Sequence, residues 1–397
     1  MVRCKMKILV VSLENCSILE DSNFLTGAGS CIDAIIKAEA KVIKVSYWSI
    51  STSLNNINTR LKILNAIIKN FFYIAIFYIK NFKIIHEMFG MKDLLLNIII
   101  LGKFSRKVKK EAPDIIHFHG TGQIIQLLSK YCEYTKRKHI ITIHLYLGKK
   151  NNEINTDLIM SESKYKWLST VSTGIKKCLQ SDYPNRFPNR IKVILNGTNY
   201  SIEKPQIDIR KRYQINNNSK ILLCIGSINE RKNQIQIVKA FSLLPEEYKK
   251  QITIIFCGKD FTNNEFELLI KKMKLEKYLI TAGTISQTDL KSYYAESEGV
   301  ITTSYHEGFS MVFLEAMVYG LPLIVPKGLE SNDDLNDSKI VTIIEERTDK
   351  AVADSMKTWF EKEWDKDYIR IYSKNFSMDT VVQNYLNYYK DIIKWKE

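Results

Sequence analysis

The chain has 397 residues, of which 45% are hydrophobic and 25% charged, and its formal net charge at pH 7 is +15. This composition excludes an intrinsically disordered chain and allows two or three domains, each with its own core. The excess of Lys and Arg favours anionic partners: nucleic acid, acidic lipid surfaces or phosphorylated small molecules. Seven cysteines without C-x-x-C spacing predict reduced, mostly buried thiols rather than a disulfide framework or a zinc site.

The first half of the chain alternates short apolar runs with longer helical patterns. Basic residues precede the first run, but its apolar part, residues 8–13, is too short for a signal peptide, so we expect a first buried strand. Continuous apolar runs separated by helices are typical of a parallel sheet that is covered on both faces. The predicted strands are 7–13, 41–48, 114–120, 139–145, 167–172 and 191–197.

Residues 61–104 combine apolar runs with lysines. The uninterrupted apolar part, residues 71–79, has about half the length needed to span a bilayer. A basic amphipathic helix in the membrane interface fits this composition. A pair of helices that covers the first sheet, with lysine stems along the apolar surface, fits it as well, and the sequence leaves both open.

The alternating pattern restarts after residue 200. A polar stretch, 198–220, separates the two halves and predicts a linker that runs into a short helix. We therefore predict an N-terminal domain of residues 1–200 and a C-terminal domain of residues 201–376. Residues 377–397 follow as an amphipathic helix that packs on the body of the protein. The strands predicted in the second half are 220–228, 252–260, 279–285, 299–305, 321–328 and 339–344.

Residues 306–322, with the sequence HEGFSMVFLEAMVYGLP, predict a helix between two parallel strands. Ser310 is placed to cap this helix at its beginning. Gly320 ends it in the left-handed conformation, and Pro322 prevents it from continuing. The segment is therefore a βαβ crossover, whose helix begins at the carboxyl edge of the sheet, where open parallel sheets bind ligands.

The beginning of this helix has the features of an anion site. The backbone N–H groups of Met311, Val312 and Phe313 have no partner within the helix, and the positive end of the helix dipole adds to their effect. Gly308 allows a close approach of a ligand. We therefore expect a diphosphate to fit here.

Two glutamates, Glu307 and Glu315, lie on either side of the apolar run. Buried carboxylates are costly unless they are paired or used. Because sugar hydroxyls donate hydrogen bonds, Glu315 is suited to a ribose and Glu307 to a hexose. A capped helix with two surface glutamates is the structural alternative.

This segment resembles the E-x7-E signature of GT-B-fold retaining glycosyltransferases of family GT4, the glycosyl transferases group 1. Glu307 and Glu315 have the signature's spacing, and the flanking residues fit it too: Gly308, Phe309, Ala316, Gly320 and Pro322. The resemblance implies an α/β protein with two doubly wound, Rossmann-like domains that face a cleft, the donor on the C-terminal one and the acceptor on the N-terminal one. It also implies that the C-terminal helix crosses back to the N-terminal domain.

Residues 223–244 resemble the first strand and helix of the family's donor domain. The family has an Arg just after the strand glycine, here Gly226, and a Lys several residues on, both bound to the diphosphate. Lys232 matches the Lys, but Ser227 occupies the Arg position, and we expect Arg231 to take its role. A fixed cation lowers the barrier because the leaving nucleoside diphosphate gains negative charge. A solvated basic turn is the structural alternative.

Residues 279–297 resemble the family's strand, turn and helix beside the nucleobase, with Gly283 in the turn. Ser286 and Asp289 form a capping-box pattern there, which we interpret as structural. The predicted donor-binding residues besides Glu315 and Arg231 are Gly308, Phe309, Ser310, Met311, Val312, Phe313, Gly226 and Gly283.

Further matches lie in the N-terminal half. Gly27 and Gly29 stand where the family has a glycine-rich loop near the donor phosphate or the acceptor, although an ordinary loop fits them nearly as well. The resemblance implies that His144 contacts the donor sugar and shapes the acceptor site, and that His119 lies at the cleft. We expect His117 to be packed in the interior.

The resemblance implies retaining transfer of a hexose or N-acetylhexosamine from a nucleotide sugar, with UDP-linked donors ahead of GDP-mannose. The expected acceptor is a lipid-linked saccharide or a growing surface polysaccharide such as a capsule. Glu307, His144 and Lys232 are the predicted catalytic residues. No D-x-D signature stands out, so we predict neither a metal nor a cofactor. We expect a cytoplasmic protein, and peripheral contact with the inner face of the cell membrane through residues 61–104 stays open.

Three alternatives remain open. A catalytically inactive GT-B subunit that binds glycans or stabilises a partner is supported by Ser227 at the Arg position. A nucleic-acid binder is supported by charge alone, without a binding motif, and we do not expect one. A GT-B sugar-nucleotide epimerase would need no acceptor.

Overall fold

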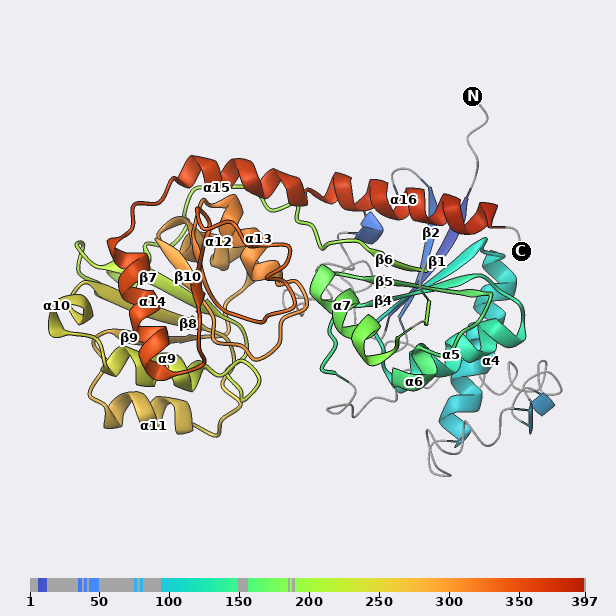
Figure 1. Cartoon of the computed structure of the whole chain (residues 1–397), viewed down its shortest axis with the longest axis horizontal. Helices are drawn as coiled ribbons and strands as arrows, with labels where there is room; N and C mark the ends of the chain where they lie inside the picture. Colours follow the sequence, from blue (N-terminus) through green and yellow to red (C-terminus); the bar gives the residue numbers. More distant parts are fainter. Residues whose placement is uncertain are drawn as a thin grey trace. The chain divides into compact units, whose positions relative to one another are not determined.

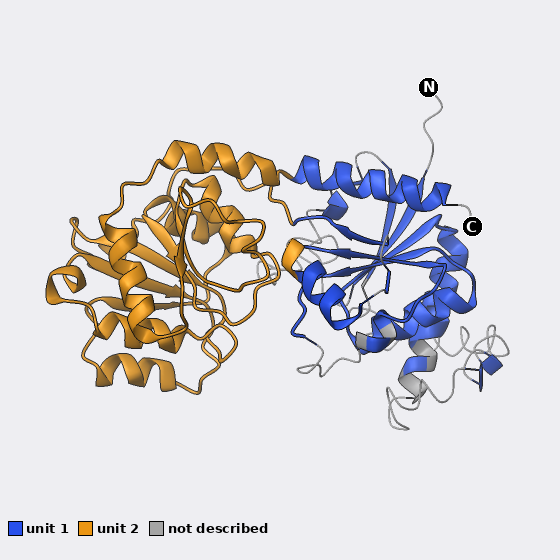
Figure 2. Cartoon of the chain, viewed as in Figure 1, with its two compact units in different colours: residues 1–171, 175–195, 378–397 blue, residues 172–174, 196–377 orange. Residues whose placement is uncertain are grey.

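The protein divides into two compact units. Unit 1 comprises Met1–Val171, Ile175–Leu195 and Met378–Glu397, and unit 2 comprises Ser172–Gly174 and Asn196–Ser377 (Figures 1 and 2). The computed structural model describes residues 6–12, 35–37, 39–40, 43–49, 75–76, 79–80, 94–148, 156–184, 186–187 and 190–395.

Unit 1 is built on a six-stranded parallel sheet with the strand order β2-β1-β3-β4-β5-β6 (Figure 1). Its central strands are buried along their whole length, as expected for runs of Ile, Leu and Val in a sheet covered on both faces. The strands are β1 (Lys7–Ser12), β2 (Lys44–Ser49), β3 (Ile115–His119), β4 (His139–Ile143), β5 (Lys166–Thr170) and β6 (Ile191–Val193).

The last helix of the chain, α16 (Met378–Lys394), belongs to unit 1 and has its colour in Figure 2. The Tyr388 hydroxyl donates to the backbone carbonyls of Leu168 and Arg190, at 2.9 Å each, so α16 is hydrogen-bonded to the sheet as well as packed on it. The predicted return of the C-terminal helix to the N-terminal domain is therefore confirmed. The other helices are α4 (Leu94–Glu111), α5 (Gln123–Tyr134), α6 (Thr156–Ile159) and α7 (Thr173–Asp182).

Unit 2 repeats the parallel design with the order β12-β11-β10-β7-β8-β9. Its first strand, β7, lies in the middle between β8 and β10, and the order of the strands reverses at this point. The crevice at such a switch point is where open α/β sheets bind ligands. The strands are β7 (Lys220–Ile225), β8 (Ile252–Cys257), β9 (Leu279–Gly283), β10 (Gly299–Ile301), β11 (Leu323–Pro326) and β12 (Val341–Ile344).

Helices cover both faces of the unit 2 sheet. One core joins the sheet to α9, α11 and α14 through Phe241, Phe266 and Trp359, while α12 and α13 lie on the other face (Figure 1). The helices of unit 2 are α8 (Ile209–Arg212), α9 (Gln234–Ser242), α10 (Glu246–Lys249), α11 (Glu265–Lys272), α12 (Gln287–Ala295), α13 (Met311–Val318), α14 (Asp349–Glu361) and α15 (Lys366–Ser373), with a 3-10 turn η2 (Lys374–Phe376).

All twelve predicted runs contain a strand, so the expectation of two doubly wound parallel sheets is confirmed. Most of residues 61–104 lie outside the described residues, and so does the apolar part 71–79 apart from 75–76 and 79. None of the helices in the described part of the chain is both long and apolar enough to cross a bilayer.

Candidate functional site

The turn after β7 brings a lysine back over the carboxyl edge of the unit 2 sheet. Gly226 has a φ of +134°, which favours glycine, and a Cβ at this position would lie 3.4 Å from Lys232 Cε. The backbone N–H of Lys232 donates to Asn229 Oδ1 at 3.0 Å, which closes the turn. The side chain of Lys232 therefore lies against a backbone that has no side chain of its own.

The loop after β10 is tied to this turn. Tyr305 donates its backbone N–H to the carbonyl of Arg231 at 2.9 Å, and Thr303 Oγ1 donates to the carbonyl of Asn233 at 2.7 Å. The predicted strand 299–305 ends at Ile301: the Thr302 N–H still donates to the carbonyl of Ile324 in β11 at 3.0 Å, but the Tyr305 N–H is bound to the β7 loop. The two loops at the switch point thus form one hydrogen-bonded unit.

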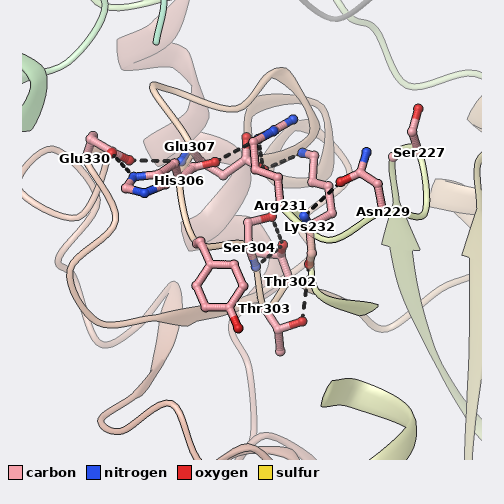
Figure 3. Close-up of polar contacts among 12 residues, drawn as sticks. Ser227, Asn229, Arg231, Lys232, Thr302, Thr303, Ser304, His306, Glu307 and Glu330 are labelled. Atoms are coloured by element: carbon pink, nitrogen blue, oxygen red, sulfur yellow. Dashed lines mark hydrogen bonds and ion pairs between the residues drawn. The ribbon is translucent and has the colours of Figure 1, made fainter. Parts of the chain in front are cut away.

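Within this unit, Lys232 and Glu307 form an ion pair between Nζ and Oε1 (Figure 3). The Arg231 guanidinium lies 3.8 Å from the same carboxylate oxygen and donates to the carbonyl of His306 at 2.8 Å. The side chains of Lys232 and Glu307 are only 15% and 10% exposed, so the pair is shielded from solvent. Ser227 has no contact with either cation drawn in Figure 3, whereas Arg231 lies beside Glu307.

A second carboxylate, Glu330, holds the loop that carries Glu307. Its Oε1 pairs with His306 Nδ1 at 2.8 Å, and its Oε2 accepts from the backbone N–H of Glu307 at 2.9 Å (Figure 3). Glu330 is buried, and both of its oxygens are used. Sequence reasoning missed this residue, although its place just after β11, at the same edge of the sheet, was a usable signal.

Helix α13 begins beside this loop, as predicted. Ser310 is its N-cap residue, although the Ser310 side chain makes no capping hydrogen bond, and Gly320 follows the helix with a φ of +77°. The prediction that three amides at the helix start are free is wrong for Phe313, because its N–H donates to the Ser310 carbonyl at 3.2 Å. Met311 and Val312, the other two predicted donors, are half-buried at the first turn.

The residues just before α13 are enclosed. Gly308 and Phe309 are buried, and the Phe309 carbonyl accepts a hydrogen bond from Asn196 Nδ2 at 2.9 Å. Asn196 precedes Gly197 in the segment after β6, and its side chain fixes the backbone that leads into α13.

Glu315 lies within α13 and is also buried. The Tyr294 hydroxyl, from α12, donates to Glu315 Oε2 at 2.9 Å. Burial raises the pKa of Glu315 to about 7, and the hydrogen bond from Tyr294 opposes this shift. Sequence reasoning found Glu315 but not Tyr294. The sequence of α13 does not reveal which side chain of another helix will bond to a buried carboxylate.

The predicted nucleobase side of the site lies after β9. Gly283 ends this strand with a φ of +68°, and its carbonyl accepts from the backbone N–H of Gly258 at 2.8 Å. Ser286 Oγ accepts from the backbone N–H of Asp289 at 3.0 Å and caps α12, which confirms its structural role.

In unit 1, the carboxyl ends of β3 and β4 bring two predicted histidines together. His119 Nδ1 lies 3.0 Å from His144 Nε2, and the two rings are stacked with centroids 5.3 Å apart. Burial lowers the pKa of both, that of His144 to about 4, so the pair is neutral at pH 7 and one ring donates to the other. His119 Nε2 is buried without a hydrogen-bond partner.

His117 is a packed interior residue, as predicted. Its Nδ1 pairs with the Tyr389 hydroxyl of α16 and its Nε2 with Thr142 Oγ1, both at 2.7 Å. Both nitrogens are therefore occupied and His117 is not available to a ligand.

Gly27 and Gly29 lie outside the described residues. In the described part of the chain, no group of three or more His, Cys, Asp and Glu side chains is arranged to hold a metal ion.

Comparison with known proteins agrees with this geometry. Residues 205–376, all within unit 2, match the family model for glycosyl transferases group 1. The uncharacterized glycosyltransferase of Methanocaldococcus jannaschii is 25% identical over 162 residues, which cover 39% of this chain and 41% of that protein. The O-antigen chain mannosyltransferase B of Escherichia coli is 27% identical over 120 residues, which cover 30% of this chain and 32% of that protein. The match thus spans less than half the length of either relative.

The whole chain is similar to solved structures. The crystal structure of Anabaena Alr3699/HepE in complex with UDP and glucose superimposes with a TM-score of 0.70 at 16% identity, covering 97% of this chain and 100% of that one. This likeness shows the fold, which is GT-B, as the sequence resemblance predicted. The residues that match the family model for glycosyl transferases group 1 lie in the unit that carries the Lys232–Glu307 pair.

Proposed function

We propose that the protein is a retaining glycosyltransferase that moves a hexose or N-acetylhexosamine from a nucleotide sugar to a saccharide acceptor. The observation that carries this proposal is the shielded Lys232–Glu307 pair at the switch point of unit 2, against Gly226 and beside the start of α13. A cation and hydrogen-bond donors suit a diphosphate, and an adjacent carboxylate suits sugar hydroxyls. No acid–base pair of carboxylates is needed if the leaving phosphate takes the acceptor proton.

The proposed donor complex assigns a role to each group. Lys232 and the amides of Met311 and Val312 bind the diphosphate, and Glu307 orients the transferred sugar. Glu315 accepts hydrogen bonds from the ribose, and backbone near Gly283 faces the base. Fixed cations and a helix end stabilise the charge that develops on the leaving diphosphate without reorganisation. We therefore propose that turnover needs no metal, and EDTA should leave it unchanged.

The donor is proposed to be UDP-linked, with GDP-mannose as the second candidate. The Anabaena protein that shares this fold was crystallised with UDP and glucose, which supports a UDP-linked donor. The Escherichia coli relative is named a mannosyltransferase, which supports a mannose donor instead. A thermal-shift screen of UDP-glucose, UDP-galactose, UDP-N-acetylglucosamine and GDP-mannose separates the two, because the bound nucleotide stabilises only the native state.

The acceptor is proposed to be a lipid-linked saccharide or a growing surface polysaccharide. The name of the Escherichia coli relative, an O-antigen chain enzyme, supports this class. The net charge of +15 would favour an anionic membrane surface, and residues 61–104 are the proposed contact. Binding of the protein to vesicles with and without acidic lipid tests the contact.

In unit 1, we propose that His144 and its partner His119 contact the sugar and the acceptor.

The main rival is an inactive subunit of the same fold, which Ser227 at the family's Arg position favours. The two proposals differ in nucleoside diphosphate release from a nucleotide sugar, measured with and without a saccharide acceptor. Release that is abolished in Glu307→Ala supports the enzyme. Binding without release under either condition would support the inactive subunit.

A further inference from the structure

Tyr294 is completely buried, and its hydroxyl points at one oxygen of the Glu315 carboxylate. The O–H donates to Glu315 Oε2 at 2.9 Å, and no other hydrogen bond reaches the Glu315 side chain from any residue that the structure describes. The hydroxyl therefore satisfies one side of the carboxylate and leaves Oε1 to a ligand.

The ring of Tyr294 is held on two sides. Tyr319 stacks on it with centroids 5.6 Å apart and planes 22° from parallel, and Tyr200 meets it edge-on at 5.9 Å. The hydroxyls of these two rings bond elsewhere, Tyr319 to the Ser201 carbonyl and Tyr200 to the Gln287 carbonyl. The Tyr294 hydroxyl consequently has one fixed direction, set by packing rather than by the ligand.

We infer that Tyr294 is a positioning residue for Glu315: its hydroxyl holds Oε2 in place and so presents Oε1 as an acceptor to the 2′- and 3′-hydroxyls of the nucleotide's ribose. This inference rests on the proposed function, because it assigns the ribose to Glu315. It goes further by naming a residue, on another helix, that does not touch the ligand and yet sets the affinity for it.

The charge of Glu315 supports this role. The groups that face it are three neutral phenols, Tyr294 from α12, Tyr319 from the end of α13, and Tyr200 from the segment after β6. Among the described residues no cation lowers its pKa, so the Tyr294 hydroxyl is the group that opposes burial. A protonated Glu315 would lose its charge as an acceptor, and removal of the hydroxyl should therefore move ribose binding to higher pH.

The neighbouring residue offers a matched control. Tyr293 is also fully buried on α12, and its hydroxyl pairs with the Tyr213 hydroxyl at 2.8 Å instead of a carboxylate. Tyr293→Phe and Tyr294→Phe each remove one buried hydroxyl from the same helix. Only Tyr294→Phe removes the hydroxyl that bonds to Glu315.

The test is isothermal titration calorimetry of the full chain at pH 5.5 to 9, with whichever of UDP and GDP the wild-type protein binds, and with its 2′-deoxy form. We expect Tyr294→Phe to weaken ribonucleotide binding about tenfold at pH 7 and to move its pH midpoint upward by about one unit. The deoxynucleotide should be affected less, Tyr293→Phe should match the wild type, and Tyr294→Phe should have no further effect in a Glu315→Gln background.

Two results would overturn the inference while leaving the proposed function in place. One is a Tyr294→Phe pH profile that matches the wild type. The other is an equal loss of ribo- and deoxynucleotide affinity that persists in the Glu315→Gln background, which would mean a general structural role. Absence of binding of either nucleotide to the wild type at every pH would instead remove the proposed function together with the inference.

Discussion

Lys232 and Glu307 lie 75 positions apart in the sequence and form a shielded ion pair where the β7 and β10 loops of unit 2 meet. The cation proposed for the diphosphate and the carboxylate proposed for the sugar are therefore partners in the free protein. An ammonium has three N–H donors, so Lys232 can keep its bond to Glu307 while it donates to a phosphate oxygen. The pair would then place the diphosphate and the sugar side by side.

Replacing Glu307 by Gln should separate nucleotide affinity from turnover. Lys232 would lose its anionic partner and become more available to phosphate, so we expect UDP to bind as tightly as in the wild type or several-fold tighter. Release of nucleoside diphosphate from the donor sugar should fall at least tenfold, because the sugar loses its acceptor. Calorimetry measures the UDP affinity, and a release assay measures turnover. Glu363→Gln, which changes an exposed glutamate of unit 2, is the control. Loss of UDP affinity together with turnover would argue that Glu307 only supports the loop.

Replacing Lys232 by Ala should lower kcat/KM for the donor about a hundredfold, since a preorganised donor to the leaving phosphate is lost. It also leaves Glu307 shielded with only Arg231 nearby, at 3.8 Å, so UDP affinity should fall as well. Lys239→Ala, an exposed lysine of α9, is the matched control and should keep wild-type activity. Steady-state release of UDP tests this, and equal activity of the two variants would rule out Lys232 as the diphosphate cation.

A buried carboxyl in unit 1 should make stability depend on pH. Burial raises the pKa of Glu39 to about 8, Tyr389 donates to its Oε1 at 2.9 Å, and its Oε2 has no hydrogen-bond partner among the described residues. Between pH 4.5 and 8 the folded protein then holds a proton that the unfolded chain has lost. Stability should therefore fall as pH rises through this window, by up to about 1.4 kcal/mol per pH unit from this group.

The variant Glu39→Gln isolates that contribution, because its amide resembles the protonated acid and does not titrate. We expect its melting temperature to exceed that of the wild type by an amount that grows from pH 5 to pH 8. Thermal unfolding of both proteins across this range measures it. A difference between them that stays constant with pH would show that Glu39 is charged in the folded protein.

Gly258 should tolerate no side chain. A Cβ there would lie 2.1 Å from the carbonyl oxygen of Gly226, which is backbone and cannot move aside without shifting the turn that carries Lys232. Gly258→Ala should therefore cost about 1–3 kcal/mol of stability and reduce donor affinity as well. Gly283→Ala is the comparison: its φ of +68° disfavours Ala, but no atom lies within 4 Å of the added carbon. Thermal unfolding that ranks the two variants in the opposite order would contradict this.

The sheets could be predicted from sequence because most strands carry apolar runs of Ile, Leu and Val, and the carboxyl edge where ligands bind then follows from the parallel design. Glu307, Glu315 and Lys232 were found through a resemblance over a short motif. The side chains that hold Glu307 and Glu315 in place were not found from the sequence. Tyr294 acts from another helix that only tertiary packing brings close, and it has no local signature. The signal for Glu330 was its place just after β11.

Local expectations failed where backbone groups had a competing partner. The strand predicted over 299–305 ends at Ile301, and the Tyr305 N–H donates to the Arg231 carbonyl in the β7 loop instead of a neighbouring strand. The Phe313 amide, expected to be free, bonds to the Ser310 carbonyl and tightens the first turn of α13. Both differences lie at the candidate site, where loops rather than regular elements satisfy the backbone.

A crystal structure of the protein with UDP tests the central claim most directly. The account predicts phosphate oxygens within hydrogen-bond distance of Lys232 Nζ and of the Met311 and Val312 amides, with a ribose hydroxyl on Glu315 Oε1. A nucleotide bound away from these groups, with Lys232 still engaged only by Glu307, would contradict it.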